Sequence, residues 1–148
     1  MFDRIEIHKQ ERILLWREKT YRIALGESPL GHKMREGDGK TPEGEYFVCT
    51  KNDKSKFHLS LGLSYPNASD AQAAFAAGRI SKAECDAVCA AQKTGKRPPW
   101  DTALGGFIMI HGGGTDSDWT KGCIALSDAD MDVLFAEVPL GTAVRILP

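Results

Sequence analysis

Short apolar segments separated by turn-forming residues recur along the chain, and this spacing constrains the fold more than any other feature of the sequence. Three early segments, RIEIHK, RILLWR and YRIAL, are rich in isoleucine, leucine and aromatic residues, and REKT at 17–20 fits a hairpin turn. They predict an antiparallel β-meander. The later segments EYFVCT, FHLSLGLSYPN, FIMIH, CIAL and TAVRIL have the same character, so we expect a mainly β fold.

Residues 69–93 differ from the rest because they are rich in alanine, which favours helix. Two helical stretches are expected, broken near Gly78, and Ser81 followed by Glu84 forms a plausible capping box for the second. This segment therefore predicts a helical insertion between strands.

A further helix, DADMDVLFAE, is expected to begin after Ser127 and to end before Pro139. GESPLGHKMREGDGKTPEGEYFV, dense in Gly, Pro and Asp, predicts a long surface loop. Together these features predict an α+β, mainly β, antiparallel sandwich-like fold. A single domain over 1–148 is expected, with the insertion at 69–93 and one helix after Cys123.

Charge and hydropathy exclude several functional classes. The net charge of −1 offers no broad attraction to nucleic acid or to an anionic membrane. No apolar run approaches the roughly 20 residues that span a bilayer, and the opening MFDRIEIHKQERILLW alternates charged and apolar residues, unlike a signal peptide. We expect no membrane span, and any export signal of the natural protein would lie upstream of this chain.

The four cysteines, Cys49, Cys85, Cys89 and Cys123, are too few for a disulfide scaffold. Cys85 and Cys89 lie four positions apart on a predicted helix, where a disulfide would be strained. Two packed thiols are therefore expected there.

The stretch HGGGTDSDWTKGC at 111–123 contains several residues whose side chains can take part in catalysis or bind a metal. It is not a phosphate-binding P-loop, because the G-x-x-x-x-G-K-[ST] spacing is missing. His111, Asp116, Asp118 and Cys123 are possible zinc ligands, but the chain has no C-x-x-C or H-x-x-x-H pair to support a structural zinc site. No metal is expected, and the two aspartates are expected to solvate the loop.

A nucleophilic site is the remaining interpretation of this stretch. His111 ends one apolar strand and Cys123 begins another, so a short loop brings both side chains to one end of the sheet. A catalytic cysteine needs a neighbouring imidazole that takes its proton, and Gly122 leaves room for a carbonyl group to approach. The residues alone leave an alternative open, in which Cys123 is a small core residue and His111 a hydrogen-bonded surface residue.

IMIHGGG followed by WTKGCIAL resembles the L,D-transpeptidase (YkuD-type) catalytic domain family, whose signature is His-Gly after an apolar strand and then [ST]-x-G-C. Upstream, GDGKTPEGEYFV is similar to the family's T-P-x-G-x-[FY] segment. FHLSLGLSYPN with the helical insertion resembles the branch that includes enzymes acting on the anchored lipoprotein of the cell wall. The resemblance covers the chain from about Tyr21 to its end.

The resemblance implies roles for individual residues. Cys123 would be the nucleophile and His111 its base, oriented by the Gly112 to Gly114 run, and Thr120 matches the hydroxyl position of the motif. Gly122 and the Cys123 amide would stabilise the oxyanion.

The implied reaction is acyl transfer at peptidoglycan stem peptides, without a cofactor. The thiolate attacks the carbonyl of the L-centre of meso-diaminopimelate, D-alanine leaves, and a thioester remains. Capture by an amine of a second stem is transpeptidation, whereas capture by water makes an L,D-carboxypeptidase, or an amidase where the bond joins the wall to a lipoprotein. Peptidoglycan is the implied partner, a wall-linked lipoprotein a further one, and the periplasm or cell envelope the location.

Two positions depart from the common family pattern: Lys121 replaces a histidine and Ala125 an arginine. The His-to-Cys separation, 12 positions from 111 to 123, is also shorter than is common. Loss of the arginine removes a bidentate clamp, which favours a hydrolytic or specialised member. A non-catalytic peptidoglycan-binding module is the rival from another class.

Four further residues are candidates for substrate binding. His32 and His58 are candidates to bind a stem carboxylate, with the alternative that they are exposed loop and strand histidines. Tyr65 is a candidate to shape the pocket, with packing at the close of a strand as the alternative, and Trp119 is expected to form a lid or wall beside the motif.

Overall fold

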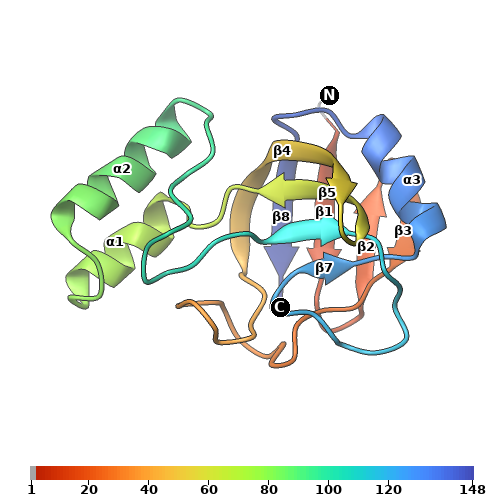
Figure 1. Cartoon of the computed structure of the whole chain (residues 1–148), viewed down its shortest axis with the longest axis horizontal. Helices are drawn as coiled ribbons and strands as arrows, with labels where there is room; N and C mark the ends of the chain where they lie inside the picture. The colour runs from red at the N-terminus through yellow and green to blue at the C-terminus, as the bar shows by residue number, and fades with distance from the viewer. Residues whose placement is uncertain (1–2) are drawn as a thin grey trace.

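The computed structural model describes residues 3–148 and contains one eight-stranded sheet with the order β3-β2-β1-β8-β4-β5-β6-β7 (Figure 1). The strands in this range are β1 (Arg4–His8), β2 (Ile13–Trp16), β3 (Lys19–Arg22), β4 (Gly44–Ser55), β5 (His58–Leu63), β6 (Met109–His111), β7 (Ile124–Ala125) and β8 (Ala143–Leu147). The helices are α1 (Ala68–Ala76), α2 (Lys82–Lys93) and α3 (Asp128–Glu137).

The predicted N-terminal meander is confirmed, because β1 pairs antiparallel with β2 and β2 antiparallel with β3. Arg17 and Glu18 form the tight turn between β2 and β3, with φ values of +49° and +66°. Positive φ at both central residues is the geometry that matches the twist of paired strands.

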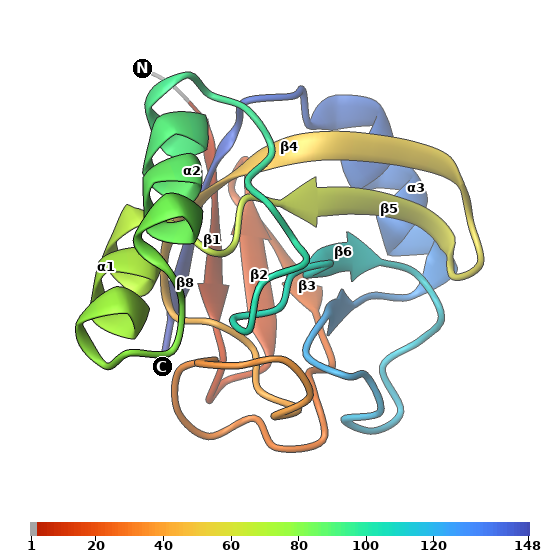
Figure 2. The same cartoon turned by 60° about the vertical axis from the view of Figure 1, so that its left-hand side comes forward.

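The sheet is mixed and curled (Figure 2). β8 pairs in parallel with β1, and β7 pairs in parallel with β6, whereas the other pairs are antiparallel. The expected sandwich-like arrangement is therefore one curled sheet. β4 is twice as long as the segment EYFVCT predicted, since it pairs with β8 at its start and with β5 through its polar second half.

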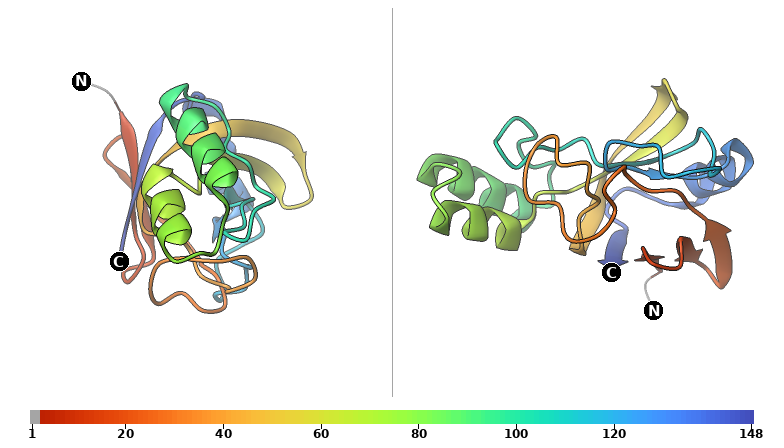
Figure 3. Two further views of the ribbon diagram at one scale, coloured as in Figure 1. Left: turned by 90° about the vertical axis from the view of Figure 1, so that its left-hand side faces the viewer. Right: turned by 90° about the horizontal axis from the view of Figure 1, so that it is seen from below.

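The helical insertion is confirmed as α1 and α2, which lie together beyond one end of the sheet (Figure 3). Ser81 caps α2 as predicted: its hydroxyl accepts from the Glu84 N–H, and the Glu84 carboxylate accepts from the Ser81 N–H. α1 begins with the same device, formed by Asn67 and Asp70. The four cysteines are free thiols.

α3 begins at Ser127 as predicted, because the Ser127 hydroxyl accepts from the Asp130 N–H. Met131 and Leu134 bury one face of α3 against the sheet beside β5. The main core is built from aliphatic side chains of the sheet, such as Ile5 and Leu14. Among residues 3–148, no helix has the length and apolar character needed to cross a membrane.

Candidate active site

β6 and β7 position the two residues of the His-to-Cys stretch. In this parallel pair, Ile110 lies opposite Ile124 and His111 opposite Ala125. Cys123 immediately precedes β7, and its sulfur accepts a hydrogen bond from the N–H of Met109 at 3.4 Å. The thiol and the imidazole therefore come from adjacent strands, two residues apart along the pair, beside the 112–123 loop.

The Cys123 thiol is partly buried and bonded to main chain on both sides. Its S–H donates to the Phe107 carbonyl at 3.3 Å, while Met109 N–H donates to the sulfur. Burial raises the pKa of the thiol above its ordinary value, and the Met109 N–H and the nearby Lys33 ammonium oppose that rise. The resting side chain is thus a neutral thiol at neutral pH.

The His111 ring is held in one tautomer. Its Nδ1 lies 2.6 Å from the Gly112 carbonyl oxygen, which only accepts, so Nδ1 carries the proton. The side chain is 3% exposed, and burial lowers its pKa although the Gly112 carbonyl acts in the opposite direction. The neutral imidazole therefore offers Nε2 as a proton acceptor, and Gly112 occupies the orienting position that the family resemblance implies.

Two aromatic rings enclose His111. Phe57 stacks on the imidazole with ring centroids 4.6 Å apart, and Trp119 packs edge-on at 5.5 Å. The Trp119 indole N–H donates to the Gly114 carbonyl at 3.0 Å. Trp119 thus forms a wall of the site. Sequence reasoning missed Phe57, because the irregular pairing at the tip of the β4–β5 hairpin has no local signal.

The loop before Cys123 is held by close contacts between main chains. Gly122 has a φ of +129°, and a Cβ there would lie 2.7 Å from the Lys40 carbonyl oxygen. Gly26 packs equally closely, since a Cβ on it would lie 2.2 Å from the Gly39 oxygen and 2.9 Å from the Gly122 nitrogen. Thr41 of the TPEG segment donates from Oγ1 to the Gly122 carbonyl at 2.8 Å. The TPEG segment therefore fixes the residue that precedes the cysteine.

Thr120 and Lys121 have different surroundings. The Thr120 hydroxyl donates to the Cys123 carbonyl at 2.8 Å and accepts from the Gly122 N–H at 3.2 Å. These two hydrogen bonds stabilise the loop conformation before Cys123. Lys121 points to solvent, with 85% of its side chain exposed and its ammonium 3.1 Å from a Glu27 carboxylate oxygen.

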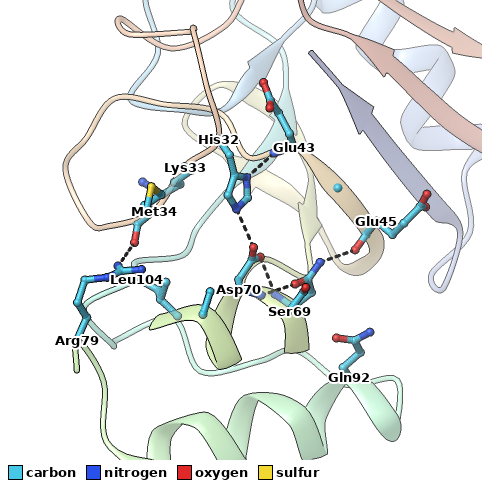
Figure 4. A pocket seen from close by; sticks show the side chains of 13 residues that line it. His32, Lys33, Met34, Glu43, Glu45, Ser69, Asp70, Arg79, Gln92 and Leu104 are labelled. Carbon is cyan, nitrogen blue, oxygen red and sulfur yellow. Dashed lines mark hydrogen bonds and ion pairs between the residues drawn. The ribbon is translucent and has the colours of Figure 1, made fainter. Parts of the chain in front are cut away.

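The largest cavity described lies away from Cys123, between the long loop and the helical insertion, with a volume of about 570 Å³ (Figure 4). His32 lines it, but both ring nitrogens are engaged: Nδ1 accepts from the Glu43 N–H at 2.7 Å, and Nε2 lies 2.7 Å from Asp70 Oδ1. Binding of a stem carboxylate by His32 stays a prediction: neither ring nitrogen has a free N–H to donate here, so such binding would have to replace one of these two contacts.

Tyr65 does not contact the cavity or the thiol. The side chain is fully buried, and its hydroxyl donates to the Leu104 carbonyl at 3.0 Å. Burial raises the pKa of the phenol. In this structure the ring packs behind His32 in the core, and a role for Tyr65 in shaping the pocket stays a prediction.

His58 and Asp118 also serve local structure. His58 lies 2.5 Å from Asp132 Oδ1, and this hydrogen bond raises the pKa of the imidazole. Asp118 was expected to solvate its loop, but its carboxylate accepts from Arg12 at 2.7 Å and from the Leu25 N–H at 2.9 Å. It ties the 112–123 loop to the turn between β1 and β2 through Arg12, and to the segment after β3 through Leu25.

A metal site has no geometric support in the part of the chain that the structure describes. Residues 3–148 contain no group of three or more His, Cys, Asp or Glu side chains that could hold a metal ion.

Comparison with known proteins gives concordant results. The L,D-transpeptidase catalytic domain (YkuD) family matches residues 3–146. Over 77 residues the chain is 35% identical to YafK of Escherichia coli strain K12, a provisionally assigned L,D-transpeptidase; this match covers 45% of the chain and 31% of YafK. The chain thus spans about a third of the length of the curated relatives that it matches.

Solved structures support the fold. The helical cell shape determining protein Pgp2 from Campylobacter jejuni superposes with a TM-score of 0.61 at 23% identity, covering 98% of this chain and 47% of Pgp2. An L,D-transpeptidase from Xylanimonas cellulosilytica gives 0.58 at 16% identity, with 99% and 60% covered. With the family match extending over nearly every residue, the chain belongs to the YkuD family of L,D-transpeptidase catalytic domains.

Proposed function

We propose that the protein is a peptidoglycan-modifying acyl-transfer enzyme in which Cys123 is the nucleophile and His111 its base. The observation that carries this proposal is the His111 tautomer: the Gly112 carbonyl binds Nδ1–H, so Nε2 is free to accept a proton beside the strand that bears the thiol. A buried imidazole held this way is suited to general base catalysis.

The two pKa shifts indicate when the proton moves. Burial raises the pKa of Cys123 and lowers that of His111, so the neutral pair is favoured over a thiolate and imidazolium in the resting site. His111 therefore takes the thiol proton as the sulfur attacks the carbonyl carbon at the L-centre of diaminopimelate. The Cys123 N–H is our candidate donor to the resulting oxyanion.

Collapse of this intermediate completes the first half of the reaction. The C–N bond breaks, the leaving amine of D-alanine takes the proton from His111, and Cys123 remains as a thioester. An amine from a second stem then restores an amide in transpeptidation, or water releases a carboxylate in hydrolysis. In either case His111 accepts the proton of the attacking group and returns it to the sulfur.

The residues around Cys123 do not decide between an amine and water as the group that attacks the thioester. Ala125 is fully buried and hydrogen-bonded through its main chain to Ala24. Because the residue is an alanine, this position has no guanidinium to hold a stem carboxylate. The solvent-directed Lys121 supplies a charge without that bidentate geometry. We keep transpeptidation as the leading proposal, with carboxypeptidase or lipoprotein-releasing amidase activity as the hydrolytic alternative, and place the enzyme in the cell envelope.

The decisive experiment is mass spectrometry of muropeptides incubated with the wild type and with Cys123→Ala. The substrates are tetrapeptide monomers and lipoprotein-linked muropeptides. Dimers formed with loss of D-alanine identify a transpeptidase, and shortened or detached monomers alone identify a hydrolase. We expect Cys123→Ala to abolish every mass change while its melting temperature stays near that of the wild type.

Two outcomes would contradict the proposal. Turnover by Cys123→Ala would exclude the thioester route. Saturable binding to sacculi without any mass change in the wild type would instead favour the non-catalytic binding module.

A further inference from the structure

We propose that Phe107 is a specificity-determining residue, whose exposed ring receives the aliphatic side chain of the stem residue that Cys123 attacks. The inference rests on the proposed function. It starts from the contact between the Cys123 thiol and the Phe107 carbonyl, 3.3 Å apart. Because the carbonyl touches the reacting sulfur, the ring of the same residue lies within one side chain's reach of the bond to be cleaved.

The backbone of Phe107 is strained. Its φ is +56°, a region that a bulky residue other than glycine rarely adopts. Residues held in such conformations cluster at functional sites, where surrounding structure maintains them. Glycine would occupy this position at lower cost, so the aromatic side chain is not explained by local folding.

The exposure of the Phe107 ring is likewise not explained by local folding. Phe107 is 60% exposed, although its ring is one of the large apolar groups that folding usually buries. The Phe107 ring packs against Trp100 with centroids 4.6 Å apart and planes inclined at 54°, and the Arg97 guanidinium lies 4.7 Å from the Trp100 ring centroid. Arg97, Trp100 and Phe107 thus form a supported platform whose outer surface is the Phe107 ring.

The segment before Phe107 is shaped to build this platform. Gly105 has a φ of +82°, and a Cβ on Gly106 would lie 2.4 Å from Trp100 side-chain atoms. The chain can therefore pass closely over Trp100 only without a side chain at Gly106, whereas a Cβ on Gly105 would lie 3.2 Å from the Glu36 Cα. The Trp100 indole N–H is buried and has no hydrogen-bond partner within residues 3–148, so the arrangement is not optimised for stability alone.

The chemistry of the platform fits an unbranched aliphatic side chain with a polar end. Methylene groups gain contact by lying on an aromatic face while their polar end stays in water. The side chain of meso-diaminopimelate has this form. In the proposed complex, these methylenes lie on Phe107 while the carbonyl of the same residue faces the sulfur.

The test measures turnover of tetrapeptide muropeptides by the wild type and by Phe107→Ala, Phe107→Gly and Phe107→Tyr. We expect KM to rise about tenfold in the alanine and glycine variants, kcat to stay within about twofold, and tyrosine to restore KM. Phe107→Gly is expected to melt no lower than Phe107→Ala, because both variants lose the ring contact with Trp100 and only glycine relieves the positive φ. Leu140→Ala, which truncates another exposed apolar side chain (61% exposed), serves as the matched control with unchanged KM.

A binding measurement separates failure of this inference from failure of the proposed function. In the Cys123→Ala background, adding Phe107→Ala is expected to weaken tetrapeptide muropeptide binding about tenfold. An unchanged dissociation constant and KM would overturn the role of Phe107 alone. No muropeptide binding by either variant would overturn this inference together with the proposed substrate.

Discussion

His111 and His32 lie in different parts of the molecule and differ in how their ring nitrogens are engaged. Only His111 has a ring nitrogen without a hydrogen bond among the described residues. At His111 the Gly112 carbonyl fixes one nitrogen, and within residues 3–148 no hydrogen bond engages the other. At His32 the Glu43 N–H and the Asp70 carboxylate engage both. A cavity of about 570 Å³ lies beside His32, whereas Cys123 directly precedes β7, the strand that pairs with the one ending at His111.

Under the proposed function, the histidine with an unengaged ring nitrogen is the one expected to react, and the histidine beside the cavity is not. The His32 network joins three elements, since Asp70 also accepts from the Tyr46 hydroxyl and the Asn67 N–H. Such a network stabilises the junction between the long loop and α1. The hydrogen bond from Nδ1 to the Gly112 carbonyl orients the His111 ring and leaves Nε2 available for the proposed proton transfer.

The largest effect is expected from exchanging the two histidines separately for glutamine. His111→Gln should lower kcat by about 10²–10⁴-fold, the range of general acid–base catalysis, because the amide nitrogen can still donate to Gly112 but no group accepts the thiol proton. His32→Gln should leave kcat within about twofold. Muropeptide turnover measures both, with circular dichroism to check folding. Equal losses in the two variants would break the comparison.

An intermediate effect on stability is expected at Asp70. Asp70→Asn replaces an acceptor of three hydrogen bonds with an amide whose NH₂ faces donors, which should cost about 1–3 kcal/mol of unfolding free energy and leave turnover unchanged. Urea unfolding gives the loss. Asp86→Asn removes only the exposed contact with Lys82 and is the control, with an expected change below about 0.5 kcal/mol. A loss of turnover in Asp70→Asn at full folding would assign chemistry to the His32 region.

The smallest effect is a shift in the pH dependence of thiol alkylation. Burial raises the pKa of Cys123, so the thiolate fraction at neutral pH is lower than that of a free cysteine and grows as pH rises through the raised pKa. The iodoacetamide rate, followed by peptide mapping, should therefore have its midpoint above that of free cysteine. Cys49, whose pKa burial raises to about 11, is the internal reference. A midpoint below that of free cysteine would reveal a preformed thiolate–imidazolium pair.

Features set by neighbours in the sequence were predicted from the sequence. Ser81 and Ser127 cap the helices that they were expected to begin, because a cap needs only a side chain and an N–H three residues later. The meander followed from the same kind of local signal. The polar half of β4 was missed, since its strand conformation depends on pairing with β5.

The surroundings of the candidate site depended on contacts between distant segments. Tyr65 lies two residues after β5, where an aromatic side chain can face either the core or a cleft. Packing against the long loop, which the sequence does not record, decides that it faces the core. Asp118 meets Arg12 across 106 positions, which no local pattern records. Phe57 and Phe107 were missed for the same reason. His111, Gly112, Cys123 and Trp119 were selected because one short motif contains them all, and their roles stay predictions.

The close approach of Gly26, Gly39 and Gly122 has a consequence for variation in this protein. These contacts are between main-chain atoms, and the buried hydroxyls of Thr41 and Thr120 add hydrogen bonds to the Gly122 and Cys123 carbonyls, so the position of the sulfur depends on this frame and not on exposed side chains. Lys121, which points to solvent one residue before Gly122, can change without displacing the nucleophile. Under the proposed function, Lys121 is therefore a position at which substitution can change the choice of acceptor without moving Cys123.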